Sequence, residues 1–310
     1  MHKESLRKAY GDTLVELGKI DERVVALEAD LGKSTMSISF GNAYPERYFQ
    51  MGIAEQNMIS TAAGLALVGK RPFASTFAVF ASGRPYDQIR SSVAIANLPV
   101  VICGSSAGLS DYGDGKTHQS VDDIAIMRVL PHMTVLSPCD AVETRKMMHA
   151  VLKHDGPVYI RINRNDLPVL TKEEGEYRIG EMSLMRDGKD AVCFATGVMV
   201  SKALEAAEML EKEGVSLRVV NVSSIKPIDV EALRKYSSDV KAIVTAEEHS
   251  VMGGLGSAVL ESLAPYGVKL SMIGMEDTYG RSAENYDVLM EYYHLTKEEI
   301  ASRVKTMLEA

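Results

Sequence analysis

Residues 51–80 read MGIAEQNMISTAAGLALVGKRPFASTFAVF and carry strong signals for both fold and chemistry. The stretch predicts the end of one strand, a helix from residue 55 made of good helix formers, and a second strand from residue 71. Glu55 stands at the start of that helix among apolar and small neighbours. A poorly solvated carboxylate there suits proton sharing. The alternative is a first-turn acid favoured by the helix dipole.

Short β-branched runs alternate with helical patterns both before and after this stretch. The runs are VVALEAD, RYFQMGI, RPFAST, LPVVICGSS, MTVLSP and GPVYIRI. Such alternation predicts an α/β fold with two doubly wound domains, whose mostly parallel sheets carry helices on both faces. We place the first domain at 1–172, a turn-rich charged linker at 173–188, and a second α/β domain at 189–310.

Composition excludes several classes of protein. The 310 residues carry a formal net charge of -8 with no basic run, which argues against nucleic acid and membrane partners. The charged start and the lack of a long apolar segment predict no signal peptide or transmembrane helix, and hence a cytoplasmic protein. Cys103, Cys139 and Cys193 are odd in number and widely spaced, so we expect inert thiols and neither zinc nor a disulfide framework.

Polar residues follow several of the predicted strands of the first domain. They are Asp30, Lys33 and Ser34, then Glu55, then the loop SDYGDGKTHQ at 110–119, then Asn163 and Arg164. Because open parallel sheets bind ligands at the carboxyl ends of their strands, we expect these groups to converge at one edge.

Two further groups of residues have a structural and a functional interpretation. Phe77 and Phe80 either belong to the core or offer a stacking face for a heteroaromatic ring beside Glu55. Asp114 and His118 lie in an irregular Gly-rich loop, where His118 either caps the following helix or contacts a polar substrate with Asp114. We assign no metal or diphosphate site to the GDG of this loop.

The GGLGSA at 253–258 superficially matches a dinucleotide-binding fingerprint. It lacks the complete glycine pattern and the later acidic residue, so it indicates a tight turn into a helix.

The blocks MGIAEQNMISTAAGLALVGKRPFASTFAVF, GDGKTHQSVDD, VLSPCDAVET and RINRNDLP together resemble the carboxyl-terminal half of transketolase. The resemblance covers essentially the whole chain and includes the pyrimidine-binding domain and the domain after it. It implies a thiamine-diphosphate enzyme whose Mg²⁺ and diphosphate site lies on a separate N-terminal subunit. We therefore expect one subunit of a split transketolase, inactive alone and active in a heterotetramer of two copies of each chain.

The resemblance implies a role for each matched residue. Glu55 matches the glutamate that hydrogen-bonds the aminopyrimidine ring nitrogen, and Phe77 and Phe80 match the aromatics that stack on that ring. Asp30 matches a carboxylate linked to cofactor and subunit contact, with a capping or loop role equally open. The substrate positions follow: Asp114 and His118 for hydroxyls near the reactive carbon, and Arg7, Ser34 and Arg164 for the phosphate of a sugar substrate.

The sequence departs from the family pattern in two places. The family's stacking tyrosine falls near Gly83, where Tyr86 is the only nearby replacement, and a phosphate-contacting histidine falls near Gly104 or Ser105. The implied reaction transfers a two-carbon ketol unit from a ketose to an aldose. The alternatives are a deoxyxylulose-phosphate synthase-like protein, favoured by YDQI at 86–89, the beta subunit of a 2-oxoacid dehydrogenase, and a non-catalytic subunit that binds a partner.

Overall fold

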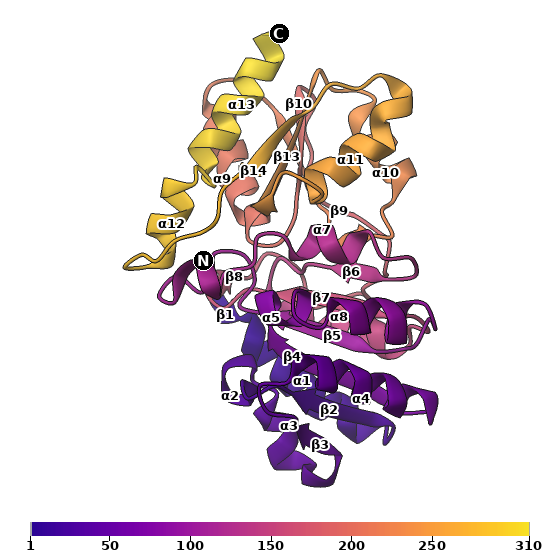
Figure 1. The fold of residues 1–310 in the computed structure, drawn as a ribbon. Helices are drawn as coiled ribbons and strands as arrows, with labels where there is room; N and C mark the ends of the chain where they lie inside the picture. Colours follow the sequence, from indigo (N-terminus) through magenta and orange to yellow (C-terminus); the bar gives the residue numbers. More distant parts are fainter. Residues whose placement is uncertain (1, 310) are drawn as a thin grey trace.

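A seven-stranded sheet forms the centre of the first unit in the computed structural model, which describes residues 2–309 (Figure 1). All its pairs are parallel except β12 with β6. From edge to edge the strands are β12 (Ser224–Lys226), β6 (Thr134–Leu136), β7 (Val158–Ile162), β5 (Val101–Ser105), β4 (Arg71–Phe77), β2 (Val24–Glu28) and β3 (Tyr48–Gln50).

Helices cover both faces of this sheet because successive strand residues point to opposite sides. Val24 and Ala26 of β2 pack with one set of helices, and Val25 and Leu27 pack with the other. The first set is α1 (Leu6–Ile20), α3 (Ile38–Ala43) and α8 (Ala141–Leu152), and the second is α4 (Glu55–Leu67), the π-helix η2 (Ile89–Ala94) and α7 (Asp123–Arg128). The shorter elements are β1 (Lys3–Ser5), which pairs with β8 (Asp166–Pro168), and α2 (Gly32–Thr35), η1 (Pro45–Arg47), α5 (Ala78–Ser82), α6 (Tyr86–Gln88) and η3 (Gly115–Thr117).

The second unit holds a five-stranded sheet, parallel except at one edge. Its strands in order are β14 (Ser271–Met275), β13 (Ala242–Ser250), β10 (Ala191–Ala195), β11 (Leu217–Asn221) and β9 (Ser183–Arg186). The helices are α9 (Met199–Lys212), α10 (Val230–Ser237), α11 (Leu255–Leu263), η4 (Ala264–Tyr266), α12 (Tyr286–Tyr292) and α13 (Lys297–Glu309). Helices α9 and α13 pack together on one face, and α10 and α11 lie on the other (Figure 1).

The predicted fold class is therefore confirmed as two doubly wound α/β units. Two short edge strands depart from the expected division of the chain. Residues 183–186, placed in the linker, form β9 and pair antiparallel with β11. Strand β12 lies beyond the linker in sequence yet joins the first sheet beside β6. The two strands are only four and three residues long, which is too short for a clear alternating pattern. The boundaries at 172 and 188 remain a prediction.

The three cysteines are free and buried, as expected of inert thiols. Burial raises the pKa of the Cys103 and Cys193 thiols to about 12. No helix within residues 2–309 has the length and apolar character needed to cross a membrane.

Candidate active site

A cavity of about 380 Å³ opens where the strands β2, β3 and β4 end. Its wall comes from four segments of the first unit that are distant in sequence. The lining residues are Ala29, Asp30, Leu31, Ile53, Glu55, Phe80, Arg84, Thr117 and His118. Of the post-strand residues expected to converge at one sheet edge, Asp30, Glu55 and His118 line this cavity. Lys33, Ser34, Asn163 and Arg164 do not line it.

Glu55 is the first residue of α4 and only 4% exposed. Its Oε1 receives a hydrogen bond from Nη1 of Arg84 at 2.7 Å, and this is an ion pair. A buried carboxylate needs such a partner, because an unpaired buried charge is costly. The sequence placed Glu55 in a poorly solvated position, but nothing in it pointed to Arg84.

Two phenylalanines and a histidine form the aromatic wall beside Glu55. Phe77 ends β4 and Phe80 lies in α5, with ring centres 6.1 Å apart and planes inclined by 14°. The His118 ring meets Phe80 edge-on at 5.4 Å and Phe77 at 6.3 Å. His118 Nδ1 and Thr117 Oγ1 lie 3.0 Å apart, which fixes the imidazole plane. Phe77 is 4% exposed, whereas Phe80 presents its face to the cavity.

The three residues matched to a phosphate clamp lie together. Arg7 donates through Nη1 to the carbonyl oxygen of Ser34 at 2.8 Å and through Nε to that of Arg164 at 3.1 Å. Arg164 donates through Nη1 to Asp111 Oδ2 at 2.6 Å, and its guanidinium lies 5.7 Å from the centre of the Phe77 ring. Burial, with the neighbouring Arg164, lowers the pKa of Arg7. This arginine cluster thus adjoins the aromatic wall.

The remaining residues that the sequence analysis singled out lie at the edge of the cavity or outside it. Asp30 lines the cavity with an exposed side chain and a left-handed backbone, φ 61°. Asp114 is exposed on the same loop as His118 but lies outside the cavity wall. Tyr86 packs against the core cluster that includes α4 and does not line the cavity. A Cβ at Gly104 would lie 2.2 Å from Tyr159 Oη, so no histidine fits there.

Gln50 is a supporting residue that the sequence did not reveal. Its Oε1 accepts hydrogen bonds from the backbone N–H groups of Asp30 at 3.1 Å and Gly52 at 2.7 Å, and its Nε2 donates to Glu28. These bonds tie the end of β2 to the turn that leads into Glu55. Burial raises the pKa of Glu28. Within residues 2–309, no cluster of three or more His, Cys, Asp or Glu side chains is arranged to hold a metal ion.

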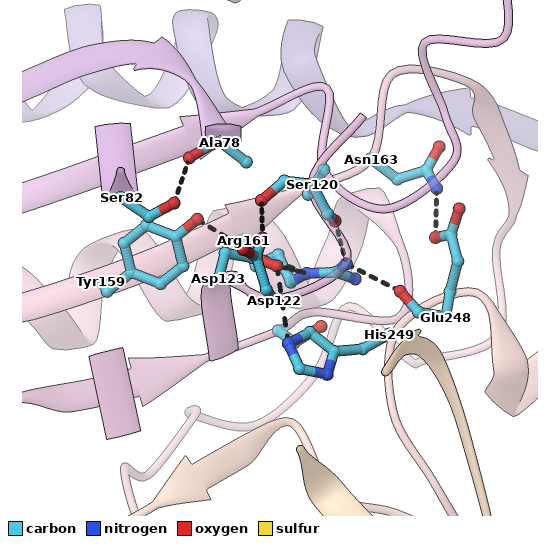
Figure 2. Close-up of polar contacts among 12 residues, drawn as sticks. Ala78, Ser82, Ser120, Asp122, Asp123, Tyr159, Arg161, Asn163, Glu248 and His249 are labelled. Carbon is cyan, nitrogen blue, oxygen red and sulfur yellow. Dashed lines mark hydrogen bonds and ion pairs between the residues drawn. The ribbon is translucent and has the colours of Figure 1, made fainter. Parts of the chain in front are cut away.

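A buried polar network joins the two units (Figure 2). Arg161 of β7 donates through Nε to Asp123 at 2.9 Å and through Nη2 to the carbonyl oxygen of Glu248 at 2.7 Å. Asn163 Nδ2 donates to the Glu248 carboxylate at 3.1 Å, and Leu109 N–H does so at 2.8 Å. Burial raises the pKa of Glu248 to about 7.

The second unit also contacts the loop that carries His118. Gln119 Nε2 donates to the carbonyl oxygen of Arg281 at 3.0 Å, and Ala283 N–H donates to the carbonyl oxygen of Tyr112 at 2.9 Å. Because Gln119 follows His118 directly, these bonds fix the position of the loop. The second unit therefore helps to hold the loop that carries His118 in place.

A buried acid beside parallel aromatic faces, with an arginine cluster next to them, is the arrangement that the matched blocks imply. Residues 2–169 match the model of the transketolase pyrimidine-binding domain, and residues 180–300 match that of the transketolase C-terminal domain. This chain belongs to the transketolase family. Membership of this family makes the chain a subunit of a transketolase-type enzyme. Enzymes of the family use thiamine diphosphate.

Relatives of the same length support this assignment to the transketolase family. A "putative transketolase C-terminal section" of Methanocaldococcus jannaschii is 45% identical, covering 97% of this chain and 95% of that protein. The "6-deoxy-6-sulfo-D-fructose transketolase subunit SqwH" of a Clostridium species is 42% identical, covering 98% and 94%. A solved structure described as "split gene transketolase, inactive beta4 tetramer" has a TM-score of 0.89, 44% identity and 99% coverage of both chains.

The family also includes longer relatives of a different activity. The 1-deoxy-D-xylulose-5-phosphate synthase of Heliobacterium modesticaldum is 36% identical, covering 98% of this chain and 47% of that protein. The two split-subunit relatives, at 45% and 42% identity, are more similar to this chain than the synthases, at 36–39%, and they match it over almost their whole length. The chain is thus a homologue of split transketolase subunits, with the synthases as more distant relatives.

Proposed function

We propose that this chain is the pyrimidine-binding subunit of a two-subunit transketolase that transfers a two-carbon ketol unit from a ketose to an aldose. The observation that supports this proposal most strongly is the buried Glu55 carboxylate, which lies in a cavity lined by Phe80 and His118. A planar heteroaromatic ring with polar nitrogens fits such a site, because its faces stack and its nitrogens pair with the acid. When bound, thiamine diphosphate supplies a nucleophilic carbon and an electron sink.

Each residue of this chain then has a defined task. Glu55 shares a proton with the aminopyrimidine ring nitrogen, and Phe77 and Phe80 hold the ring plane. Asp30 lies at the cavity edge, where cofactor and neighbouring subunit meet. The substrate is oriented by a second set of side chains: hydroxyls by Asp114 and His118, and a terminal phosphate by Arg7, Ser34 and Arg164. Arginine suits an anion because its planar fork donates two hydrogen bonds at once.

The proposed assembly has two copies of this chain and two of a separate N-terminal subunit. That partner carries the diphosphate and Mg²⁺ site, in line with the family's division between two domains. A solved relative that is described as an inactive tetramer of one subunit type supports this need for a partner. We expect this chain to show no transfer activity alone with thiamine diphosphate and Mg²⁺.

The test is reconstitution with the partner subunit and an assay of ketose-to-aldose transfer, run beside an assay of pyruvate consumption. Glu55→Gln should lower turnover by about 10²–10⁴-fold, as loss of a positioned proton-transfer group does. Glu22→Gln, at an exposed turn, is the matched control and should leave turnover unchanged. Pyruvate consumption would identify a synthase instead. Full turnover in Glu55→Gln would indicate a non-catalytic subunit.

A further inference from the structure

Arg84 lines the cavity and contacts both the buried acid and the aromatic wall. Its Nη1 lies 2.7 Å from Glu55 Oε1, and its guanidinium carbon lies 4.1 Å from the centre of the Phe80 ring. All three side chains line the same cavity of about 380 Å³. Arg84 therefore makes both a charged hydrogen bond to the buried acid and a face-on contact with the aromatic wall.

These are the same two contacts that the proposed function assigns to an aminopyrimidine. A guanidinium is flat, carries N–H donors and stacks on aromatic faces, so its recognition chemistry matches that of an aminopyrimidine ring. A ring that pairs with Glu55 Oε1 and stacks on the same face of Phe80 competes directly with Arg84 for both contacts. We propose that Arg84 competes with the cofactor ring for Glu55 and must leave Glu55 before the cofactor binds, which makes it a gating residue that sets cofactor affinity. The proposal rests on the proposed function of Glu55.

The burial of the two partners shows why the exchange is feasible. The Glu55 side chain is 4% exposed, whereas that of Arg84 is 48% exposed. Arg84 thus regains water when it leaves, and only Glu55 requires a replacement donor. The contact is also single, between one nitrogen and one oxygen. By contrast, Arg128 holds Glu261 through two separate bonds of 2.8 and 2.7 Å.

A competing internal group lowers the apparent affinity of a ligand by the fraction of molecules that are open. If the closed pair dominates, deleting the guanidinium should tighten cofactor binding by about tenfold. The effect has the opposite sign from that of an ordinary binding residue, whose removal weakens binding. The sign of the change therefore separates the two roles.

The experiment measures the dissociation constant of thiamine diphosphate, with Mg²⁺ present, by calorimetry on the complex with the partner subunit. Arg84→Met should bind the cofactor about tenfold more tightly. Arg90→Met removes an arginine that is exposed and makes no ion pair within residues 2–309, so it should not change the constant. Unchanged or weaker binding by Arg84→Met would overturn the proposal.

Two further variants keep the outcome interpretable. If Arg84→Met does not fold, Arg84→Lys, which keeps the charge but loses the planar group, should tighten binding by a smaller factor. Weaker binding by Arg84→Lys would also overturn the proposal. Glu55→Gln tests the premise: if it leaves both cofactor affinity and turnover unchanged, the proposed function fails. If it weakens binding while Arg84→Met does not tighten it, the gating role alone fails.

Discussion

Gln119 of the first unit donates a hydrogen bond from Nε2 to the carbonyl oxygen of Arg281 in the second, at 3.0 Å. The same nitrogen lies 3.2 Å from the carbonyl oxygen of Asp111. One buried amide thus joins three parts of the chain: the loop before His118, the residue after it, and the segment between β14 and α12. The second unit thus helps to position the loop that carries His118.

Replacing Gln119 with Ala should lower the free energy of unfolding by about 1–3 kcal/mol, because it leaves buried carbonyl groups without a donor. In the reconstituted enzyme we also expect KM for the sugar substrate to rise, since the loop that carries Asp114 and His118 loses its anchor. Chemical denaturation and steady-state kinetics measure the two effects. A variant that loses stability with unchanged KM would show that the anchor serves folding alone.

Glu248→Gln tests the charge state of the network between the units. Burial raises the pKa of Glu248 from 4.5 to about 7. In this range the folded chain retains a proton that the unfolded chain has lost, so the contribution to stability is complete below pH 4.5 and lost as the pH rises to about 7. The neutral amide should abolish that loss, so the advantage of the variant over the native chain should grow from pH 5 and reach about 3 kcal/mol at pH 7 to 8.

The measurement is denaturant unfolding of both proteins across this pH range. Two neighbours on β13 also titrate with altered values, since burial raises the pKa of Glu247 to about 7 and lowers that of His249 to about 4. Both remain in the variant, so their effects cancel in the comparison. If the free energy of unfolding changed with pH in the same way in both proteins, the raised pKa of Glu248 would be contradicted.

Arg164→Met should impair phosphorylated sugars selectively. Arg164 pairs with Asp111, so the variant also removes a countercharge from a carboxyl group that is 3% exposed. We expect KM for a phosphorylated acceptor to rise by about tenfold or more, because a charge-assisted hydrogen bond contributes roughly 1.5–3 kcal/mol. KM for the matching unphosphorylated aldose should change little. Equal losses with both substrates would remove Arg164 from the clamp.

Gly104→Ala should destabilise the first unit. The added Cβ would meet Tyr159 Oη at 2.2 Å, and that hydroxyl is fixed by its hydrogen bond to Asp123 at 2.8 Å. Overpacking of this kind costs about 1–3 kcal/mol. Gly64→Ala is the matched control, since its Cβ meets open space within α4, where it should raise helix stability by up to about 1 kcal/mol. Thermal unfolding of both variants gives the comparison, and equal melting temperatures would contradict it.

The regular elements could be predicted because their signals are local. The β-branched runs of β2, β4, β5 and β7 and the helix formers of α4 specify strands and a helix by composition and period. The burial of Glu55 also followed from its apolar neighbours. Arg84, Gln50 and Gln119 escaped prediction because their partners lie in other segments of the chain, at distances that only the folded chain determines. Their contacts depend on tertiary structure and leave no periodic trace in the sequence.

Strand β12 has a consequence for any attempt to express the first unit alone. A fragment ending at residue 172 would lack Ser224–Lys226, the segment that pairs with β6. The unpaired backbone of β6 would then become an open template for other chains, and such edges promote aggregation. Lys226 would be lost too, with its Nζ donations to the carbonyl oxygens of Arg128 and Leu130 at the end of α7. The two halves of this subunit are therefore not independent folding units.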